Sequence, residues 1–489
     1  MLVSFLLLSL QYKKIKIMKK EQFYKITDYI ADLISDTEFA PHTYAVGGSV
    51  RDLVMGNDIK DIDLVIDLPN GGVNLANYID KLGECGNVVI YPKYGTAMFK
   101  LNAFPEDEIE CVMTRGEKYL DKDTRNPVCV FSTLDDDARR RDLTMNALYY
   151  NLTTKEIFDP TGGLDDIKNT NLVKTTNPDP DTVFDDDPLR ILRVVRFATR
   201  YGRDIEENTF KSMVKFVDRL EIISKERIQS EFNKIITCKN AVKGVETLVN
   251  IGAMKYIIPE LEETVGLEQN HYHFGDVYQH TIALLDYYHK NFEVSNSVTV
   301  ALALLLHDIG KIKTQTVKDG KVHFYNHEFV GASMVEPILR KLKYDLDTIN
   351  DVKFLVKNHM RTKNAGDGLK NIKDKTFNKL AHDCGCEKRY LMLAIVIECD
   401  NMSHKSEHCI YGQKDAFVER LGAAHRMMSY KLPVNGDDVM TELGIKPGID
   451  VKKVLHSLMK LAYNNPNITK PMCLKQMHFV YKQMKQGEK

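Results

Sequence analysis

The sequence predicts an α+β protein in which a mixed sheet with helices is followed by a long all-helical region. Short apolar runs separated by turns fill residues 43–157, a pattern typical of strands. Beyond Asp181 these runs give way to helical periodicity that continues to the C-terminus. With 489 residues, the chain is too long for one ordinary core, so several domains are expected.

Six apolar runs are predicted to be strands, at residues 43–47, 62–67, 87–92, 96–101, 109–114 and 147–152. An amphipathic helix is predicted over 73–84, and three later helices over 188–202, 226–236 and 240–253. The Pro- and Gly-containing segment 159–167 marks a domain change near residue 160.

The composition limits the classes of function. Hydrophobic residues make up 43% and charged residues 28%, as in a soluble globular protein. The net charge is −1, so local basic patches must bind any polyanion. The nine cysteines are scattered, which favours free thiols and a cytoplasmic location.

The N-terminal segment is expected to lie outside the fold. Residues 1–10 are apolar but too few to span a bilayer. Lysines follow this segment, whereas a signal peptide has its positive charge first. Met18 is therefore a candidate for the true start, and no membrane association is predicted.

The stretch "YAVGGSVRD" carries a short strand into Gly47 and Gly48, with a helix expected from about Ser49. Glycines let the backbone approach a ligand closely, and a helix start directs N–H groups at an anion. Arg51 could add a charged fork to a phosphate oxygen. A Gly-Gly turn by itself also suits a plain strand–turn–helix corner.

In "KDIDLVID", strand alternation places Asp61 and Asp63 on one face. Two adjacent carboxylates repel each other unless a cation lies between them, and Mg²⁺ binds such oxygens together with substrate phosphates. An isolated Asp-x-Asp would more often be a solvated strand end. When the pair follows a Gly-Gly-x-x-Arg turn at this distance, it is a much more specific signal for a metal site that acts on a bound phosphate.

Together these stretches resemble the nucleotidyltransferase head of the polymerase-β superfamily, and more closely the family of class II tRNA nucleotidyltransferases and bacterial poly(A) polymerases. The resemblance implies a polymerase-β-like head followed by a helical neck, body and tail. It also implies that Gly47, Gly48 and Arg51 bind a triphosphate, while Asp61 and Asp63 bind the catalytic Mg²⁺.

Two further motifs follow in the family's order. "RRRDLTMNAL" at residues 139–148 resembles its Arg-Arg-Asp motif, implying that Arg141 contacts the triphosphate and Asp142 the ribose hydroxyl. "DDDPLRILRVVRFATRYG" at 185–202 resembles its nucleotide-selecting helix. Taken alone, residues 139–148 could equally be an exposed basic turn. Residues 185–202 could equally be a solvent-exposed helix with salt bridges along its surface.

Asp187 and Arg190 are three residues apart, so we expect them to share a helix face. Their side chains could hydrogen-bond the Watson–Crick edge of C or A, whereas U and G offer different patterns. By resemblance, Arg193 and Arg196 also meet the nucleotide. The family usually has Glu-Asp where this chain has Asp186 followed by Asp187.

Two more features extend the resemblance over residues 43–260. Glu110, on a predicted strand, could be the third carboxylate and the base for the incoming 3′-hydroxyl, although a surface role is equally compatible. "SKERIQSEFNKII" at 224–236 matches the family's neck helix.

A second constellation combines histidines and aspartates. An adjacent His-Asp doublet ends an otherwise apolar run. Burying these two polar side chains costs free energy unless they bind a metal ion or make hydrogen bonds. Neutral imidazoles and carboxylates are good transition-metal ligands. The candidate ligands are His280, His307, Asp308, His327, His359 and Asp400.

Their order resembles the HD metal-dependent phosphohydrolase domain, with His327 and His359 as the extra ligands of a binuclear site. Lys311 in "HDIGK" fits the same pattern. "HEFVGA" and "TMNAL" make the arrangement most similar to the type in Bacteroidetes-like bacteria and their phages. Ni²⁺, Mn²⁺ or Co²⁺ is the expected metal.

The resemblance implies an enzyme that adds CCA to the tRNA acceptor end from CTP and ATP. Poly(A) polymerase, and addition of CC or A alone, are the alternatives. The HD domain could hydrolyse 2′,3′-cyclic phosphates or phosphomonoesters, or serve as a helical scaffold. A phosphodiesterase with a regulatory head is disfavoured by the complete Asp61/Asp63 and Asp187/Arg190 sets.

The expected domains are an N-terminal extension and first helix (1–40), a nucleotidyltransferase head (41–160), a helical neck with the nucleotide-selecting helix (161–270), an HD domain (271–405) and a helical tail (406–489). Lysines of the tail suit tRNA phosphates. The sequence does not predict an oligomeric state.

Overall fold

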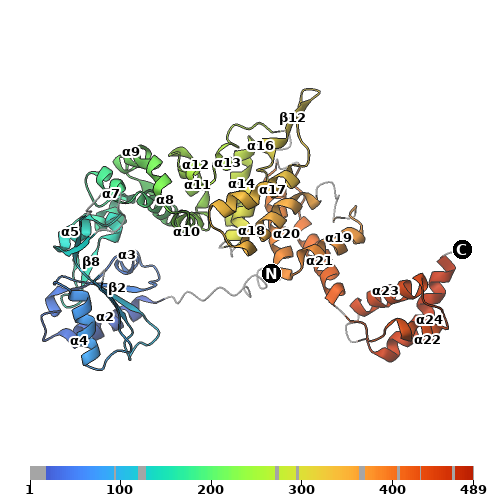
Figure 1. Ribbon diagram of the computed structural model, residues 1–489, viewed down its shortest axis with the longest axis horizontal. Helices are drawn as coiled ribbons and strands as arrows, with labels where there is room; N and C mark the ends of the chain where they lie inside the picture. Colours follow the sequence, from blue (N-terminus) through green and yellow to red (C-terminus); the bar gives the residue numbers. More distant parts are fainter. Residues whose placement is uncertain are drawn as a thin grey trace.

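The computed structural model describes residues 18–92, 95–118, 128–269, 275–292, 297–362, 369, 371–404, 408–429, 431–464 and 468–487. The extension expected over residues 1–17 lies outside this range. The molecule is elongated, with a sheet-containing head at one end and a three-helix unit at the other (Figure 1). Met18 joins the head, where its backbone N–H donates to Ile59.

A seven-stranded sheet in the order β3-β4-β5-β2-β1-β8-β9 forms the head. Its strands are β1 (Thr43–Val46), β2 (Ile62–Ile66), β3 (Val89–Tyr91), β4 (Thr96–Phe99), β5 (Ile109–Met113), β8 (Tyr149–Asn151) and β9 (Ile157–Phe158). Neighbours pair antiparallel except β2 and β5, which run parallel. All six predicted strands are present.

Two helices, α2 (Lys20–Ile34) and α4 (Gly71–Lys81), contribute to the core of the head. Tyr78 of α4 donates its hydroxyl hydrogen to the carbonyl of Leu33 on α2, so the helices lie side by side. Close packing of α4 depends on Gly72, where a Cβ would lie 2.6 Å from the carbonyl oxygen of Cys111.

The helical neck follows, with α7 (Pro180–Asp186), α8 (Leu189–Tyr201), α9 (Glu207–Phe216), α10 (Lys225–Ile236) and α11 (Ala241–Asn250). The predicted helices over 188–202, 226–236 and 240–253 correspond to α8, α10 and α11. Their apolar faces turn inward because hydrophobic residues recur every three or four positions.

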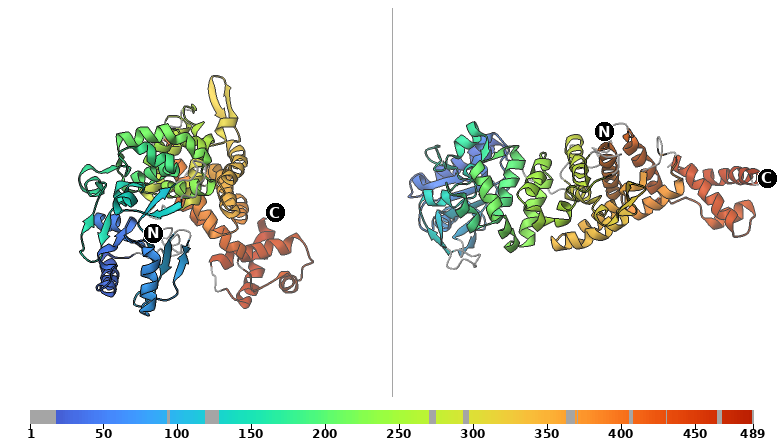
Figure 2. Two further views of the ribbon diagram at one scale, coloured as in Figure 1. Left: turned by 60° about the vertical axis from the view of Figure 1, so that its left-hand side comes forward. Right: turned by 90° about the horizontal axis from the view of Figure 1, so that it is seen from above.

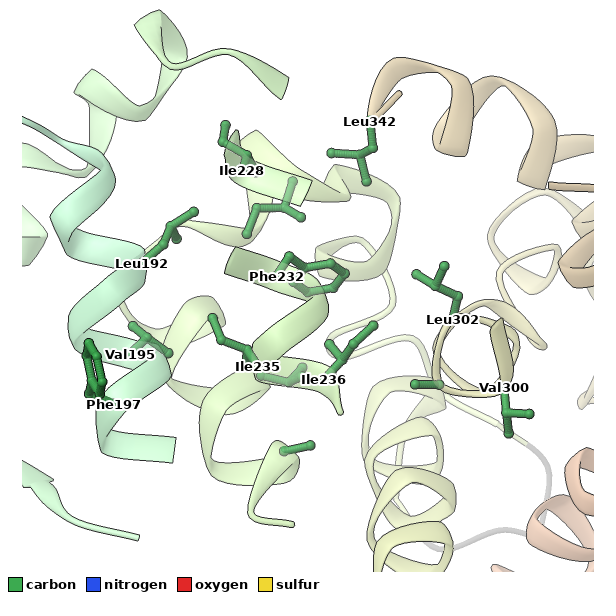
Figure 3. Close-up of a cluster of buried hydrophobic side chains, with 14 of the residues drawn as sticks. Leu192, Val195, Phe197, Ile228, Phe232, Ile235, Ile236, Val300, Leu302 and Leu342 are labelled. Carbon is green, nitrogen blue, oxygen red and sulfur yellow. The ribbon is translucent and has the colours of Figure 1, made fainter. Parts of the chain in front are cut away.

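The body contains α14 (Val277–Asn291), α15 (Val298–Leu306), α17 (His327–Lys341), α18 (Leu346–Asn358), α19 (Asp374–Cys384), α20 (Glu387–Met402) and α21 (Gln413–Ser429). Helix α10 lies between α8 and α15, with Ile235 beside Val195 and Ile236 toward Leu302 (Figure 3). Neck and body therefore share a continuous apolar core.

The expectation that strands stop beyond Asp181 is wrong. β10 (Leu172–Val173) pairs with β11 (Asp204–Ile205), and β12 (Gln315–Lys318) pairs with β13 (Lys321–Phe324) in a hairpin. These strands are too short or too polar to give a clear hydrophobic period. The Asp-Gly turn of the hairpin was the available signal.

At the C-terminus, α22 (Gly436–Leu443), α23 (Ile449–Asn464) and α24 (Lys470–Gly487) enclose a small core of their own. The predicted helical character of the tail is confirmed. In the part of the chain that the structure describes, no helix is long and apolar enough to cross a membrane.

Two candidate active sites

The first candidate site is built around the Gly-Gly turn between β1 and α3 (Gly48–Met55). Gly47 has φ +74°, a conformation that favours glycine. A Cβ there would lie 3.5 Å from Nη1 of Arg141 and 4.0 Å from Oδ2 of Asp63. The turn thus brings backbone, a guanidinium and a carboxylate to one place.

Three carboxylates converge beside this turn. Asp63 on β2 is the register partner of Glu110 on the parallel strand β5, and Asp61 immediately precedes β2. Burial, followed by the charges of Asp61 and Glu110, raises the pKa of Asp63 to about 6. Such mutual repulsion is relieved by a divalent cation, so the donor set fits Mg²⁺.

Arg141 is held in place by Asp137, which sequence analysis did not single out. The buried Asp137 carboxylate accepts from Arg141 Nη2 at 3.0 Å, from Arg140 at 2.6 Å and from the Tyr149 hydroxyl at 2.7 Å. Burial raises the pKa of Asp137, but the two arginines outweigh it and bring the pKa to about 2. The remaining edge of Arg141 faces the Gly47 turn.

Arg51 lies beneath the turn and is only 5% exposed. It donates to Asn146 Oδ1 at 2.6 Å and to Asp52 Oδ1 at 3.0 Å. Asn146 in turn donates to Asp142, whose other oxygen accepts from Arg193 at 2.7 Å. The predicted contacts of Arg51 with phosphate and of Asp142 with ribose remain predictions.

The head and neck are joined at this network. The Tyr201 hydroxyl on α8 donates to Asp52 on α3 at 2.9 Å. The Arg51 guanidinium lies 5.1 Å from the Phe197 ring centre and 5.5 Å from that of Tyr201. These partners are far apart in sequence, so no local motif could have indicated them.

The prediction that Asp187 and Arg190 share a helix face is wrong. Asp187 has extended backbone and lies between α7 and α8, because the following Pro188 disfavours the helical conformation before it. Its carboxylate accepts from the Leu189 N–H at 3.1 Å and from Arg227 at 2.7 Å. The pair therefore flanks the start of α8.

Arg190 and Arg196 are anchored separately. Arg190 donates to the carbonyl oxygen of Arg140 at 2.8 Å. Arg196 lies 3.1 Å from Glu231 on α10. Burial lowers the pKa of Arg196; Glu231 opposes the shift, and nearby Arg193 adds to it. With Arg193, they place three arginines along α8.

The second candidate site lies in the body, where the six predicted ligands meet from α14, the end of α15, the start of α17, the turn after α18, and α20. They divide into two groups that could each hold a metal ion: His280 with His307 and Asp400, and Asp308 with His327 and His359. All six residues are buried. Asp308 lies near both groups, 3.0 Å from His307 and 3.1 Å from His327.

Backbone carbonyl groups orient three of the imidazoles. Nδ1 of His307, His327 and His359 lies 2.8, 2.9 and 2.6 Å, respectively, from the carbonyl oxygen three residues earlier. This leaves each Nε2 facing the cluster, as in many metal sites. Within the described residues the buried Nε2 of His359 has no hydrogen-bond partner, and those of His307 and His327 face only the Asp308 carboxylate, an arrangement that fits metal ions.

The protonation states of His280, His359 and Asp308 suit metal binding. Burial lowers the pKa of His280 to about 4 and that of His359 to about 3. The pKa of Asp308 lies well below its usual value, because His307 and Lys311 outweigh the effect of burial. Lys311 Nζ is 2.6 Å from Asp308 and donates to Gln269, a partner not foreseen from the sequence.

Family models describe three segments of the chain. Residues 43–173 match the poly A polymerase head domain, 202–264 the probable RNA and SrmB-binding site of polymerase A, and 272–394 the HD domain. With the two sites above, these matches define a nucleotidyltransferase with an HD domain.

Curated relatives give the family. The Multifunctional CCA protein of Neisseria meningitidis serogroup C / serotype 2a is 31% identical over 316 residues, covering 62% of this chain and 68% of that protein. That of Actinobacillus pleuropneumoniae serotype 5b is 31% identical over 324 residues, covering 64% and 74%. The chain belongs to the class II CCA-adding enzyme family.

Solved structures show the same fold. The Bacillus stearothermophilus CCA-adding enzyme in complex with CTP aligns with a TM-score of 0.57 and 19% identity, covering 95% of this chain and 99% of that chain. The Thermotoga maritima CCA-adding enzyme complexed with tRNA_CCA gives 0.59 and 20%, covering 97% of each chain.

Proposed function

We propose that this protein adds CCA to tRNA 3′ ends from CTP and ATP. The observation that carries the proposal is the convergence of Asp61, Asp63 and Glu110 beside the Gly47 turn. Membership in a family whose relatives are named Multifunctional CCA proteins supports the choice of tRNA as acceptor.

In this proposal Asp61 and Asp63 hold Mg²⁺, which when bound supplies positive charge for hydroxyl activation and for the leaving pyrophosphate. Glu110 accepts the proton of the tRNA terminal hydroxyl. Arg141 and the N–H groups at Gly47 and Gly48 bind the triphosphate, since the guanidinium edge faces the turn.

Base selection is assigned to Asp187 and Arg190, which flank the start of α8. Each already makes a hydrogen bond that would orient it, through Arg227 and the Arg140 carbonyl. Arg193 and Arg196 line the same helix and would add positive charge at the nucleotide. Arg51 and Asp142 complete the proposed nucleotide contacts at the phosphate and the ribose, respectively.

Poly(A) polymerase, or addition of CC or A alone, are the alternatives within the family. The test supplies Mg²⁺ and each labelled NTP separately to tRNAs ending in the discriminator base, in C or in CC. CCA addition requires two C residues followed by one A and no further extension. Repeated A addition to any RNA would support poly(A) polymerase instead.

A second proposed activity belongs to the body. The six-ligand cluster supports hydrolysis of 2′,3′-cyclic phosphates or phosphomonoesters with Ni²⁺, Mn²⁺ or Co²⁺, because its buried imidazoles and carboxylates suit transition metals. The test measures hydrolysis of 2′,3′-cyclic AMP with each metal. Absence of hydrolysis with all three would reduce the body to a scaffold.

We propose a division into head, neck, HD domain and tail near residues 160, 270 and 405. The tail, with its own core, would add tRNA phosphate contacts through its lysines. A cytoplasmic location, as expected from the cysteine usage, would bring the protein together with tRNA and nucleoside triphosphates.

A further inference from the structure

The β12–β13 hairpin projects from the helical body (Figures 1 and 2). Its strands are joined by Asp319 and Gly320, with φ +53° and +71°, as in the tight turns that favour Asp-Gly. Within the described chain the two strands form a sheet of their own. A two-stranded hairpin is only marginally stable alone. Its surface residues therefore bear on whether a ligand binds to it.

One face of the hairpin concentrates positive charge. Thr316 pairs with His323 and Lys318 with Lys321, and cross-strand partners project on the same face. Both lysines are exposed. Like charges directly opposite each other destabilise a hairpin. An anion bound between the lysines would remove that cost.

Aromatic rings extend the same face. The His323 and Tyr325 rings are stacked, with centres 5.3 Å apart and planes 9° from parallel. Tyr325 is 64% exposed, so its outer surface is open to a further ring. Lysines beside exposed aromatic rings are the combination that binds single-stranded nucleic acid, through phosphates and stacked bases.

The hairpin is attached directly to the proposed metal site. The carbonyl oxygen of Phe324 lies 2.9 Å from Nδ1 of His327. The Phe324 ring centre is 5.3 Å from Nζ of Lys311, which itself contacts Asp308 at 2.6 Å. By strand alternation the Phe324 ring lies on the face opposite the lysines, so these contacts tie the base of the hairpin to the ligand cluster. Tyr325, at the base of the lysine face, is two residues from the ligand His327, so a strand that follows that face to its base ends beside the cluster.

We propose that this face, formed by Lys318, Lys321, His323 and Tyr325, binds the single-stranded 3′ end of an RNA and delivers its terminal phosphate to the HD site. The inference rests on the proposed hydrolase activity of that site and names its substrate class as RNA ends rather than free nucleotides. The lysines contact phosphates, and the rings stack on a base.

The first test compares two substrates on the full-length protein: 2′,3′-cyclic AMP, and a short single-stranded RNA ending in a 2′,3′-cyclic phosphate. Lys318→Glu places a carboxylate opposite Lys321, which should leave the hairpin at least as stable. We expect kcat/KM for the RNA to fall about tenfold, with the small substrate unaffected. Equal losses on both substrates, or no loss on the RNA, would overturn the proposal.

Salt dependence separates the roles of the two kinds of side chain. Replacing both Lys318 and Lys321 with Thr should reduce the slope of log affinity against log salt by about 1.4, from about 0.7 per contact. Tyr325→Ser should weaken binding about tenfold with little change in slope. A matched control, Lys375→Glu with Lys379→Glu on α19, removes exposed lysines of the same domain and should change neither quantity.

Two further measurements keep the proposal distinct from the others. CCA addition by the Lys318→Glu variant should match that of the wild type; a parallel loss would assign the hairpin to the head reaction and overturn the inference. If the wild type hydrolyses neither substrate, the hydrolase proposal fails. Photo-crosslinking of thiouridine-containing RNA then decides: labelling at His323 or Tyr325 upholds the RNA surface, and its absence overturns it.

Discussion

The head site and the HD site hold metal-binding groups in opposite ways. In the head, Asp61 and Glu110 are exposed and Asp63 is half-buried at the edge of the Gly-Gly turn. In the HD site all six ligands are buried, and backbone carbonyl groups orient three of the imidazoles. The HD site is thus organised before metal arrives, whereas Mg²⁺ in the head would also need substrate phosphates.

Asp63 in the head and Asp308 in the HD site show the same contrast, because their pKa values are shifted in opposite directions. Burial and neighbouring carboxylates raise the pKa of Asp63 to about 6. For Asp308, the positive partners His307 and Lys311 outweigh burial and lower the pKa well below its usual value. The residue type is identical, so the neighbours determine which carboxylate needs an added cation to stay ionised.

The largest expected effect comes from Asp63→Asn or Asp63→Ala. Either change should reduce nucleotide addition by at least about 10³-fold while tRNA binding survives, because a metal ligand is lost. Asp61→Ala should behave alike. Incorporation of labelled CTP and ATP measures the effect.

The matched control is Asp67→Asn, at the other end of β2. The Asp67 carboxylate accepts from the Thr114 hydroxyl at 2.9 Å, a bond that an amide oxygen can keep. The Asp67→Asn variant should add nucleotides at a rate within a few fold of the wild-type rate. Near-normal activity of the Asp63 variants would remove that residue from the metal site.

The comparison also predicts that the sites work independently. His307→Ala with Asp308→Ala should abolish hydrolysis of 2′,3′-cyclic AMP and leave CCA addition in Mg²⁺ largely intact. Removing Asp308 strips the buried Lys311 of its partner, which costs about 3–5 kcal/mol of stability. Folding of the variant therefore needs to be checked by circular dichroism.

A second variant avoids that cost. His327→Gln removes one ligand and keeps the contact between Asp308 and Lys311. It should reduce hydrolysis strongly, and its CCA addition should equal that of the wild type. Loss of addition in a correctly folded variant would show that the two sites are coupled.

Substitutions at the base-selecting pair should have a smaller effect than loss of the metal ligand Asp63. Asp187→Ala or Arg190→Ala should weaken the preference for CTP and ATP over UTP and GTP by about 10- to 100-fold, the effect of roughly 1–3 kcal/mol of lost hydrogen bonding. The ratio of kcat/KM values for the four nucleotides measures it. An unchanged preference in both variants would exclude the pair from base recognition.

The sequence was most informative where chemistry fixes residue types at short spacing. The Gly47 turn, the Asp61/Asp63 pair and the His307–Asp308 doublet could be recognised because each motif spans only a few residues. Tyr201 could not be, since its partner Asp52 is set by packing between α8 and α3. Asp137 lies one helical turn before Arg141, and only that i,i+4 spacing hinted at its role.

The nucleotide-selecting helix shows why a correct motif can still give a wrong geometry. Three-residue spacing placed Asp187 and Arg190 on one helix face, but the intervening Pro188 moves Asp187 out of the helix. The restriction that proline places on the preceding residue was readable in the sequence. The outcome required the fold, because Pro188 could also have stood inside a kinked helix.

The smallest expected effect tests how Asp187 is positioned. Arg227 on α10 donates to Asp187 at 2.7 Å, and about half of the arginine side chain is exposed. Exposed ion pairs contribute about 0–1 kcal/mol, so Arg227→Ala should leave stability nearly unchanged. We expect a loss of only a few fold in discrimination against UTP, seen mainly in KM, because Asp187 stays held by the Leu189 N–H. Arg219→Ala, which removes a partly exposed arginine paired with Asp185, is the matched control and should not alter discrimination. A drop as large as that of Asp187→Ala would instead make Arg227 a direct nucleotide contact.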